Sequence, residues 1–145
     1  MSLSERLPAA VVVAVLVGGA AIAGWNMFGG GDDAAASVTV HVPDLSPQAA
    51  AGKVDFDANC ALCHGINGAG GTGKGPPLIH AIYNPGHHSD AAFYYAAANG
   101  VRQHHWLFGN MPPQPQVSEG QMAGIVAYIR ELQVANGIVY QEHRM

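Results

Sequence analysis

The sequence predicts an all-α domain of three or more helices joined by long loops. Three stretches carry the residues that start and stop helices, and no set of pairing strands can be placed between them. The connecting segments are rich in turn formers, since the chain has 19 glycines and 9 prolines among its 145 residues. Only 11% of the residues are charged. A helical domain with such loops needs a further apolar surface at its centre, because its helices alone bury too little.

The first two helices are predicted from their caps. Ser46 is a favoured N-cap residue and Pro47 suits the first helical position, so a helix begins there and runs towards the cysteines. Ser89 opens a second helix, DAAFYYAAA, which Asn99 and Gly100 end. Both helices therefore have defined ends within a loop-rich chain.

A third helix follows a capping box. Ser118 and Gln121 have the spacing at which each side chain bonds to the backbone of the other, and Asn136 with Gly137 provides the stop. Apolar side chains repeat at helical spacing along one face of this helix: Met122, Ile125, Ile129 and Leu132. We expect that face to pack against the rest of the domain.

Residues 60–64 read CALCH, and C-x-x-C-H is the attachment signature for c-type haem. In this signature the thiols of Cys60 and Cys63 form thioether bonds to the haem vinyl groups, and His64 is the proximal iron ligand. A thioredoxin-like redox pair would need a surrounding βαβ pattern. A zinc site would need two further ligands at matching spacing, and the chain has no second pair of cysteines. We therefore expect one covalent haem c, which supplies the missing apolar surface.

Met111 is predicted to be the distal iron ligand. It lies in HHWLFGNMPPQ, between Gly-Asn and a Pro-Pro pair, whereas a methionine that only fills a core needs no stiff frame. Pro112 and Pro113 fix their own φ angles and bias the preceding residues to extended forms. Met/His ligation also raises the reduction potential of a haem. The alternative distal ligands are His104 and His105, a few residues away.

From residue 47 to about 135 the chain resembles the class I, monohaem cytochromes c. Its motifs occur in the order of that family: Gly52 and Phe56 precede CALCH, and GPPL follows at 75–78. GNMPP then resembles the distal-ligand loop of the bacterial members, and GIVAYIREL resembles the final helix. This ordered match is more specific than the haem signature alone.

The resemblance implies two contacts. The carbonyl of Pro76 should accept a hydrogen bond from His64, which sets the orientation and basicity of a ligating imidazole. The final helix, with Ile125 and Tyr128, should cross the first helix near Gly52, where a glycine allows the backbones to approach closely.

The chain departs from the mitochondrial members of the family in two ways. It lacks the lysine-rich face on which those proteins dock, so an acidic partner surface is not implied. It also has five histidines in the haem domain: His80, His87, His88, His104 and His105. These are interpreted either as solvated loop residues or as a peripheral copper or zinc site built on the two HH pairs.

Trp106 and Arg102 are the candidate donors to the haem propionates, which need hydrogen bonds where they are partly buried. The alternative for Trp106 is an ordinary place in the core.

The first 28 residues predict a single transmembrane anchor. No charged residue occurs between Arg6 and Asp32, and about 20 apolar residues suffice to span a hydrocarbon core. Trp25 and Phe28 lie where an interfacial aromatic belt would be. The alternative is a cleaved signal peptide, with cleavage motifs at 21–23 or 34–36.

Within the anchor, Ala10, Ala14 and Gly18 form a ridge of small residues that would allow a partner helix to approach. Residues 29–46 are interpreted as a connector, 47–135 as the haem domain and 136–145 as a tail. In the connector, SVTVHVP alternates between apolar and polar residues, which favours an edge strand or a segment laid against a partner.

These features predict an electron-transfer protein and not an enzyme. A haem iron with two protein ligands has no open position for a substrate, so one-electron outer-sphere transfer remains. The net charge of −4 and the scattered basic residues exclude a nucleic-acid-binding surface.

The expected partners are membrane redox complexes: a quinol-oxidising complex and a terminal oxidase or a photosynthetic reaction centre. Because the family acquires its haem outside the bacterial inner membrane, the haem domain should lie on the periplasmic side of a single-pass anchor. Two alternatives stay open. In the first, the chain is a fixed haem subunit of a larger redox enzyme. In the second, it is a gas sensor or small peroxidase with a labile distal ligand.

Overall fold

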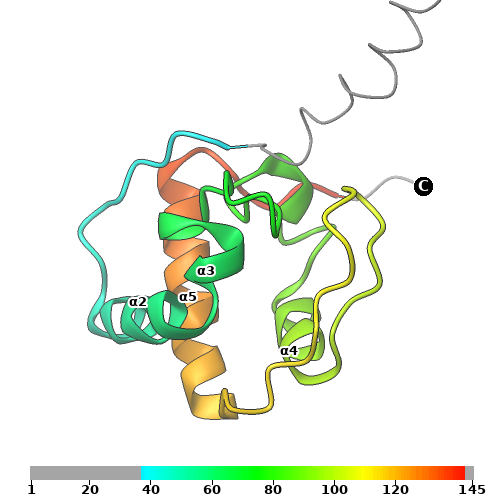
Figure 1. Ribbon diagram of the computed structural model, residues 1–145. Helices are drawn as coiled ribbons and strands as arrows, with labels where there is room; N and C mark the ends of the chain where they lie inside the picture. Colours follow the sequence, from blue (N-terminus) through cyan, green and yellow to red (C-terminus); the bar gives the residue numbers. More distant parts are fainter. Residues whose placement is uncertain (1–36, 143–145) are drawn as a thin grey trace, which may run out of the picture. The chain divides into compact units, whose positions relative to one another are not determined.

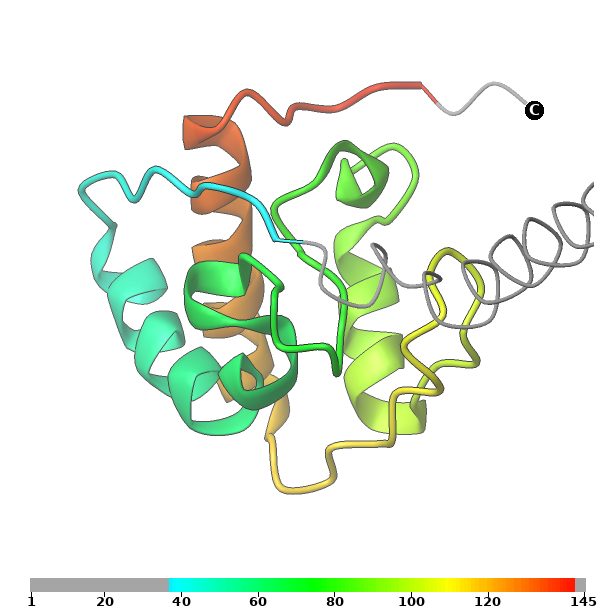
Figure 2. The same cartoon turned by 45° about the horizontal axis from the view of Figure 1, so that its top comes forward.

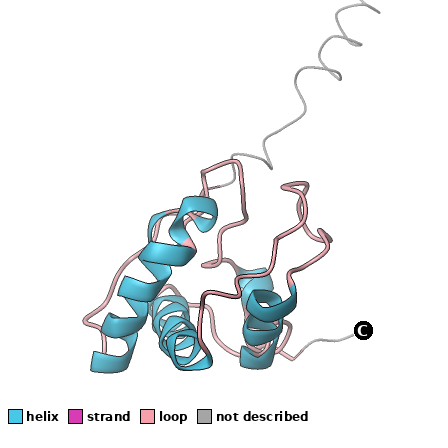
Figure 3. Cartoon of the chain, turned by 60° about the horizontal axis from the view of Figure 1, so that its bottom comes forward, coloured by secondary structure: helices cyan, strands magenta, loops and turns pink. Residues whose placement is uncertain are grey.

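Four α-helices and the loops between them make up residues 37–142, the part of the chain that the computed structural model describes (Figure 1). Within that part no residue belongs to a strand (Figure 3). Two isolated bridges occur there, Ser37 with Gly70 and Val101 with Met111. The helices are α2 (Pro47–Asn59), α3 (Ala61–His64), α4 (Asp90–Asn99) and α5 (Glu119–Ala135), with 3₁₀ turns at Ile66–Gly68 and Ala81–Tyr83. The predicted all-α class is confirmed for these residues.

The helix ends follow the local sequence signals with one exception. Ser46 caps α2 and accepts a hydrogen bond from the backbone N–H of Ala49. The capping box of Ser118 and Gln121 is present at the start of α5. Ser89 occupies the N-cap of α4, but its side chain makes no capping hydrogen bond. The position of this cap was predicted, whereas its hydrogen bond is absent.

The core is built where α2 crosses α5. A Cβ atom placed on Gly52 would lie 1.9 Å from the carbonyl oxygen of Gly124, so only a glycine permits this approach of the two backbones. Phe56 and Tyr128 are fully buried beside the crossing, with ring centroids 5.5 Å apart. The crossing near Gly52 that the resemblance implied is therefore present, with Gly124 as its partner.

The segment before α2 lies along this core, although it forms no strand. The backbone N–H of Val38 donates to the carbonyl of Ala69 at 2.9 Å, and the side chain of Asn136 bonds to both backbone groups of His41. Val38 and Val40 pack against the core, whereas Val42, which the alternation places on the same face, is exposed, and the edge strand that the pattern favoured is absent from these residues. The surface that this segment covers therefore belongs to its own domain.

Figures 1 and 2 place α2 and α4 on either side of α5. Among residues 37–142, no helix has the length and apolarity needed to cross a membrane. The predicted anchor at residues 1–28, with Ala10, Ala14 and Gly18, lies outside the described residues.

Candidate functional site

A cavity of about 890 Å³ lies between the CALCH segment and the loop that carries Met111. This volume falls within the range of roughly 300–1,000 Å³ that is typical of pockets for cofactors and other small molecules. Cys60, Cys63, His64 and Met111 all line it. Most of its other walls are apolar side chains from α2, α4, α5 and the loops between them, among them Phe56, Leu78, Phe93, Val101, Met122, Ile125 and Ile129.

The two cysteines are brought to this cavity by the short helix α3. Cys60 ends α2, and its carbonyl accepts hydrogen bonds from the backbone N–H groups of Cys63 and His64 at 3.1 and 2.9 Å. Both thiols are half-buried and free of a disulfide. Burial, with smaller effects from Cys63 and Asp55, raises the pKa of the Cys60 thiol to about 11. The thiol therefore remains uncharged against an apolar cavity.

His64 is oriented by the loop that follows α3. Its Nδ1 lies 2.9 Å from the carbonyl oxygen of Pro76, the contact that the resemblance implied. Because a carbonyl only accepts, Nδ1 carries the proton and Nε2 keeps its lone pair. Burial lowers the pKa of His64, which favours the neutral imidazole that a metal requires. The side chain is thus prepared to ligate iron through Nε2.

Met111 is fixed by more than its prolines. Its backbone pairs with Val101 through two hydrogen bonds of 2.9 and 3.0 Å. Gly100 has a φ of 75°, and a Cβ atom placed there would lie 2.6 Å from the carbonyl oxygen of Met111. This pairing was not predicted, because the loop contains no strand pattern. The backbone of Met111 is therefore held against the end of α4.

His104 and His105 also border the cavity, and both are exposed. His104 Nδ1 lies 2.9 Å from the carbonyl oxygen of Arg102, and His105 Nε2 lies 3.2 Å from His87 Nε2. The choice of Met111 over these two histidines as the distal ligand stays a prediction.

The two expected propionate donors differ in position. Trp106 is half-buried, lines the cavity and stacks on Tyr83 with ring centroids 5.9 Å apart. Arg102 is exposed and does not belong to the cavity lining. Trp106 therefore borders the cavity and Arg102 does not, and both roles as propionate donors stay predictions.

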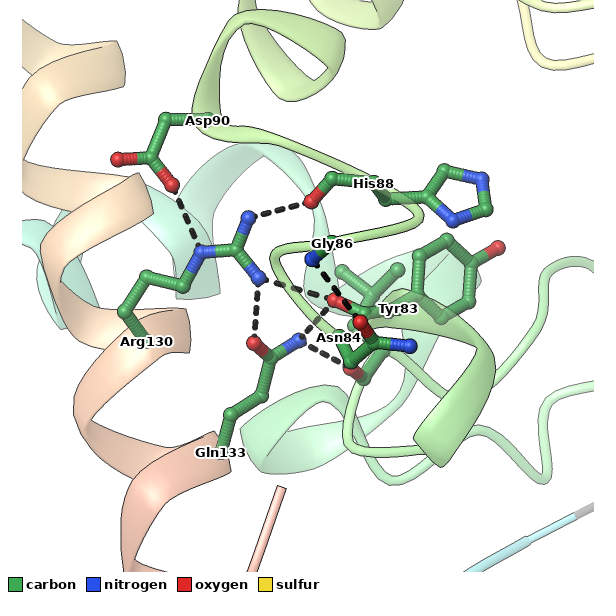
Figure 4. Close-up of polar contacts among 8 residues, drawn as sticks. Tyr83, Asn84, Gly86, His88, Asp90, Arg130 and Gln133 are labelled. Atoms are coloured by element: carbon green, nitrogen blue, oxygen red, sulfur yellow. Dashed lines mark hydrogen bonds and ion pairs between the residues drawn. The ribbon is translucent and has the colours of Figure 1, made fainter. Parts of the chain in front are cut away.

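Two residues that sequence reasoning missed hold the wall formed by the 78–90 loop (Figure 4). Arg130 donates to the carbonyls of Tyr83 and His88 at 2.9 and 2.5 Å. Gln133, which is fully buried, donates to the carbonyl of Leu78 at 3.0 Å. The available signal was weak: a charged and an amide side chain, three residues apart, in a helix that also carries Glu119, Gln121 and Glu131.

The sequence model of the cytochrome c family matches residues 49–133, more than half of the chain. The chain belongs to the cytochrome c family. Comparison with curated proteins and with solved structures gives no match. The match makes the chain a class I cytochrome c, and membership implies a covalently bound haem c, with Cys60 and Cys63 in the C-x-x-C-H position.

The residues of this cytochrome fit that cofactor. The cavity brings two thiols and an imidazole to one wall and a thioether to another, and its remaining walls are mainly apolar. These are the groups that attach and ligate a haem. When bound, haem c exchanges one electron between its ferrous and ferric states, and the chain supplies its attachment, ligands and surroundings.

Proposed function

We propose that this cytochrome is a tethered electron carrier whose iron is ligated by His64 and Met111. The observation that supports it best is that His64 and Met111 both line one mainly apolar cavity, each positioned by hydrogen bonds. The Pro76 carbonyl orients His64, and the pairing with Val101 fixes the backbone of Met111. Two such ligands would hold the iron six-coordinate in both oxidation states. Little reorganisation then accompanies the electron, which suits a carrier.

The tether is the apolar segment at residues 1–28, placed in the bacterial inner membrane with the haem domain on the periplasmic side. Arg6 near the start of the segment and Asp32 after its end agree with that orientation. A tethered domain meets neighbouring complexes at an effective concentration of the order of mM. The proposed partners are a quinol-oxidising complex as donor and a terminal oxidase or photosynthetic reaction centre as acceptor.

The second candidate is a fixed haem subunit of a larger redox enzyme. The alternating segment before α2 was one feature in its favour, but Val38 and Val40 pack against the cytochrome's own core. The ridge of Ala10, Ala14 and Gly18 is the remaining feature that favours a partner helix. Co-purification with a catalytic subunit in mild detergent distinguishes this candidate from a free carrier.

The first experiment is the visible spectrum of the reduced, detergent-solubilised protein with and without carbon monoxide. The wild type should give no carbon monoxide complex, because both axial positions are held by the protein. Met111→Ala should bind carbon monoxide and have a lower reduction potential. Met122→Leu is the matched control, since Met122 also lines the cavity but lies on α5, and it should behave as the wild type.

Two results would contradict the assignment. Carbon monoxide binding by the wild type at native pH would show an open or labile iron position and would favour a gas sensor or small peroxidase over an electron carrier. An unchanged spectrum in Met111→Ala, with loss of the low-spin spectrum when His104 and His105 are replaced by alanine, would make a histidine the distal ligand.

A further inference from the structure

We propose that His87, His88 and His105 bind one divalent first-row transition-metal ion, at a site separate from the haem iron. Each of the three rings offers one nitrogen, and these nitrogens all lie within 4.8 Å of one another. Two of the ligands come from the loop before α4 and the third from the loop after it. The fold, and not a local sequence motif alone, therefore brings them together.

The spacing of two of the nitrogens is that of ligands on one ion. His87 Nε2 and His105 Nε2 lie 3.2 Å apart. Tetrahedral Zn²⁺ with Zn–N bonds of roughly 2.0–2.1 Å has its ligand nitrogens about 3.3 Å apart. A ring-to-ring hydrogen bond has a similar length, but it joins two rings and does not account for the third. A shared ion accounts for the convergence of all three.

His88 has the second contact that is typical of metal-binding histidines. Its Nδ1 lies 2.8 Å from the carbonyl oxygen of Ile82, so Nδ1 carries the proton and Nε2 keeps its lone pair. Histidines that bind metals almost always donate their other ring N–H to a carbonyl or carboxylate, which fixes tautomer and orientation. The ring of His88 is also packed against Tyr83, with centroids 4.7 Å apart.

The backbone that carries the two adjacent histidines is held from both sides. The N–H groups of His87 and His88 donate to the carbonyl of Asn84 at 3.0 and 2.9 Å. The carbonyl of His88 accepts from Arg130, whose Nε also lies 2.8 Å from Asp90 (Figure 4). Binding an ion would thus require little ordering of this loop, which favours affinity.

The donor set selects the kind of ion. Three imidazoles without a carboxylate suit zinc and copper, whereas calcium and magnesium prefer oxygen ligands. Cu²⁺ should bind more tightly than Zn²⁺, following the general order of affinities for nitrogen sites. A water molecule would complete the coordination, as it does in other three-histidine sites.

The site adjoins the haem cavity, because His88 and His105 also line that cavity. A bound cation would favour the ferrous haem over the more positive ferric haem, and so raise its reduction potential. This regulatory consequence rests on the proposed electron-carrier function. Metal binding itself does not, so the two ideas can fail separately.

The experiment is equilibrium dialysis of the full-length holoprotein, freed of every metal except its haem iron, against Zn²⁺ and, in a separate sample, against Cu²⁺. One equivalent of each ion should bind, and the reduction potential should rise when it does. His87→Ala and His105→Gln should each weaken binding at least tenfold, and His87→Ala, whose side chain does not line the haem cavity, should retain the haem spectrum. His41→Ala is the matched control, since His41 lies before α2 outside the cluster, and it should bind as the wild type does.

Several results would overturn the proposal. One is a wild-type holoprotein that retains neither ion at micromolar concentrations. Another is binding that the two cluster variants do not weaken, because the ion would then lie elsewhere. A third is a change of haem potential in the variants when the wild type binds no metal, which would make the rings partners of the haem. The carbon monoxide experiment tests the electron-carrier function independently of all three.

Discussion

The helix pair α2 and α5 and the helix α4 are stabilised in different ways, although all three border the same cavity. Three residues of α2 and eight of α5 are buried, whereas no residue of α4 is. The α2–α5 side is held by direct contact between the two helices. The α4 side faces the space that the family fills with haem. The comparison teaches that α4 depends on the cofactor space for its packing more than α2 and α5 do, because those two helices border the same cavity but also bury residues against each other.

The side chains of α4 agree with this division. Phe93, Tyr94 and Ala97 are only partly buried, and Tyr95 is 68% exposed. The guanidinium of Arg130 lies 5.0 Å from the centre of the Phe93 ring, which is a direct tie from α5 to α4. Such a cation–π contact contributes roughly 0.5–1 kcal/mol at an exposed site, much less than a buried core.

Preventing haem attachment should have the largest effect on the difference between the two sides. In a Cys60→Ala, Cys63→Ala double variant, α4 and the loop at 100–111 should lose most of their protection against hydrogen exchange. The helices α2 and α5 should keep more protection, because Phe56, Tyr128 and Leu132 remain in contact without the cofactor. Exchange measured residue by residue on the purified variant and on the holoprotein provides the test.

The single variant Cys63→Ala is the control, since it leaves one thioether bond. Its protection in α4 should lie between that of the double variant and that of the holoprotein. Equal loss of protection in α4 and α5 would show that the haem holds both sides equally and would refute the division.

Replacing the glycines of the helix crossing should destabilise the α2–α5 side directly. Gly52→Ala should lower the free energy of unfolding by about 3 kcal/mol or more. The new Cβ would lie 1.9 Å from a backbone oxygen, so the helices would have to separate. Gly124→Ala should cost about 1 kcal/mol, since its nearest neighbour, the Cα of Gly52, would be 3.1 Å away. Urea denaturation of the holoproteins measures both.

Gly120→Ala is the matched control on the same helix. No atom lies within 4 Å of a Cβ placed there, so helix propensity alone should act and stabilise the protein by up to about 1 kcal/mol. Equal costs for Gly52→Ala and Gly124→Ala would mean that the helices adjust freely, against the geometry of the crossing.

Most of the α2–α5 side and the haem-attachment segment could be predicted from the sequence. Helix ends, the haem signature and the apolar face of α5 are local patterns, and each predicts a structure within a few residues. The pairing of Val101 with Met111 and the bonds from Arg130 to the 78–90 loop were not predicted. These contacts join segments that are far apart or irregular, and no periodicity marks them in a single sequence.

The histidines show the same limit. The two HH pairs suggested a metal site, but not which rings meet. The structure brings His105 to His87 and His88, whereas His80 lies against Trp106 with ring centroids 5.3 Å apart. That selection depends on how the loops before and after α4 fold back on each other, which residue types alone do not determine.

The last of these effects concerns the contacts that join α5 to the α4 side. Arg130→Ala should cost about 2 kcal/mol, because hydrogen bonds from a charged group to the carbonyls of Tyr83 and His88 would be lost. Asp90→Ala removes only the ion-pair partner, a carboxylate that is 64% exposed, and should cost less than about 1 kcal/mol. Urea denaturation gives both values, and hydrogen exchange at His87 and His88 should quicken only in Arg130→Ala. A larger cost for Asp90→Ala would mean that the ion pair, and not the bonds to the loop carbonyls, joins α5 to the α4 side.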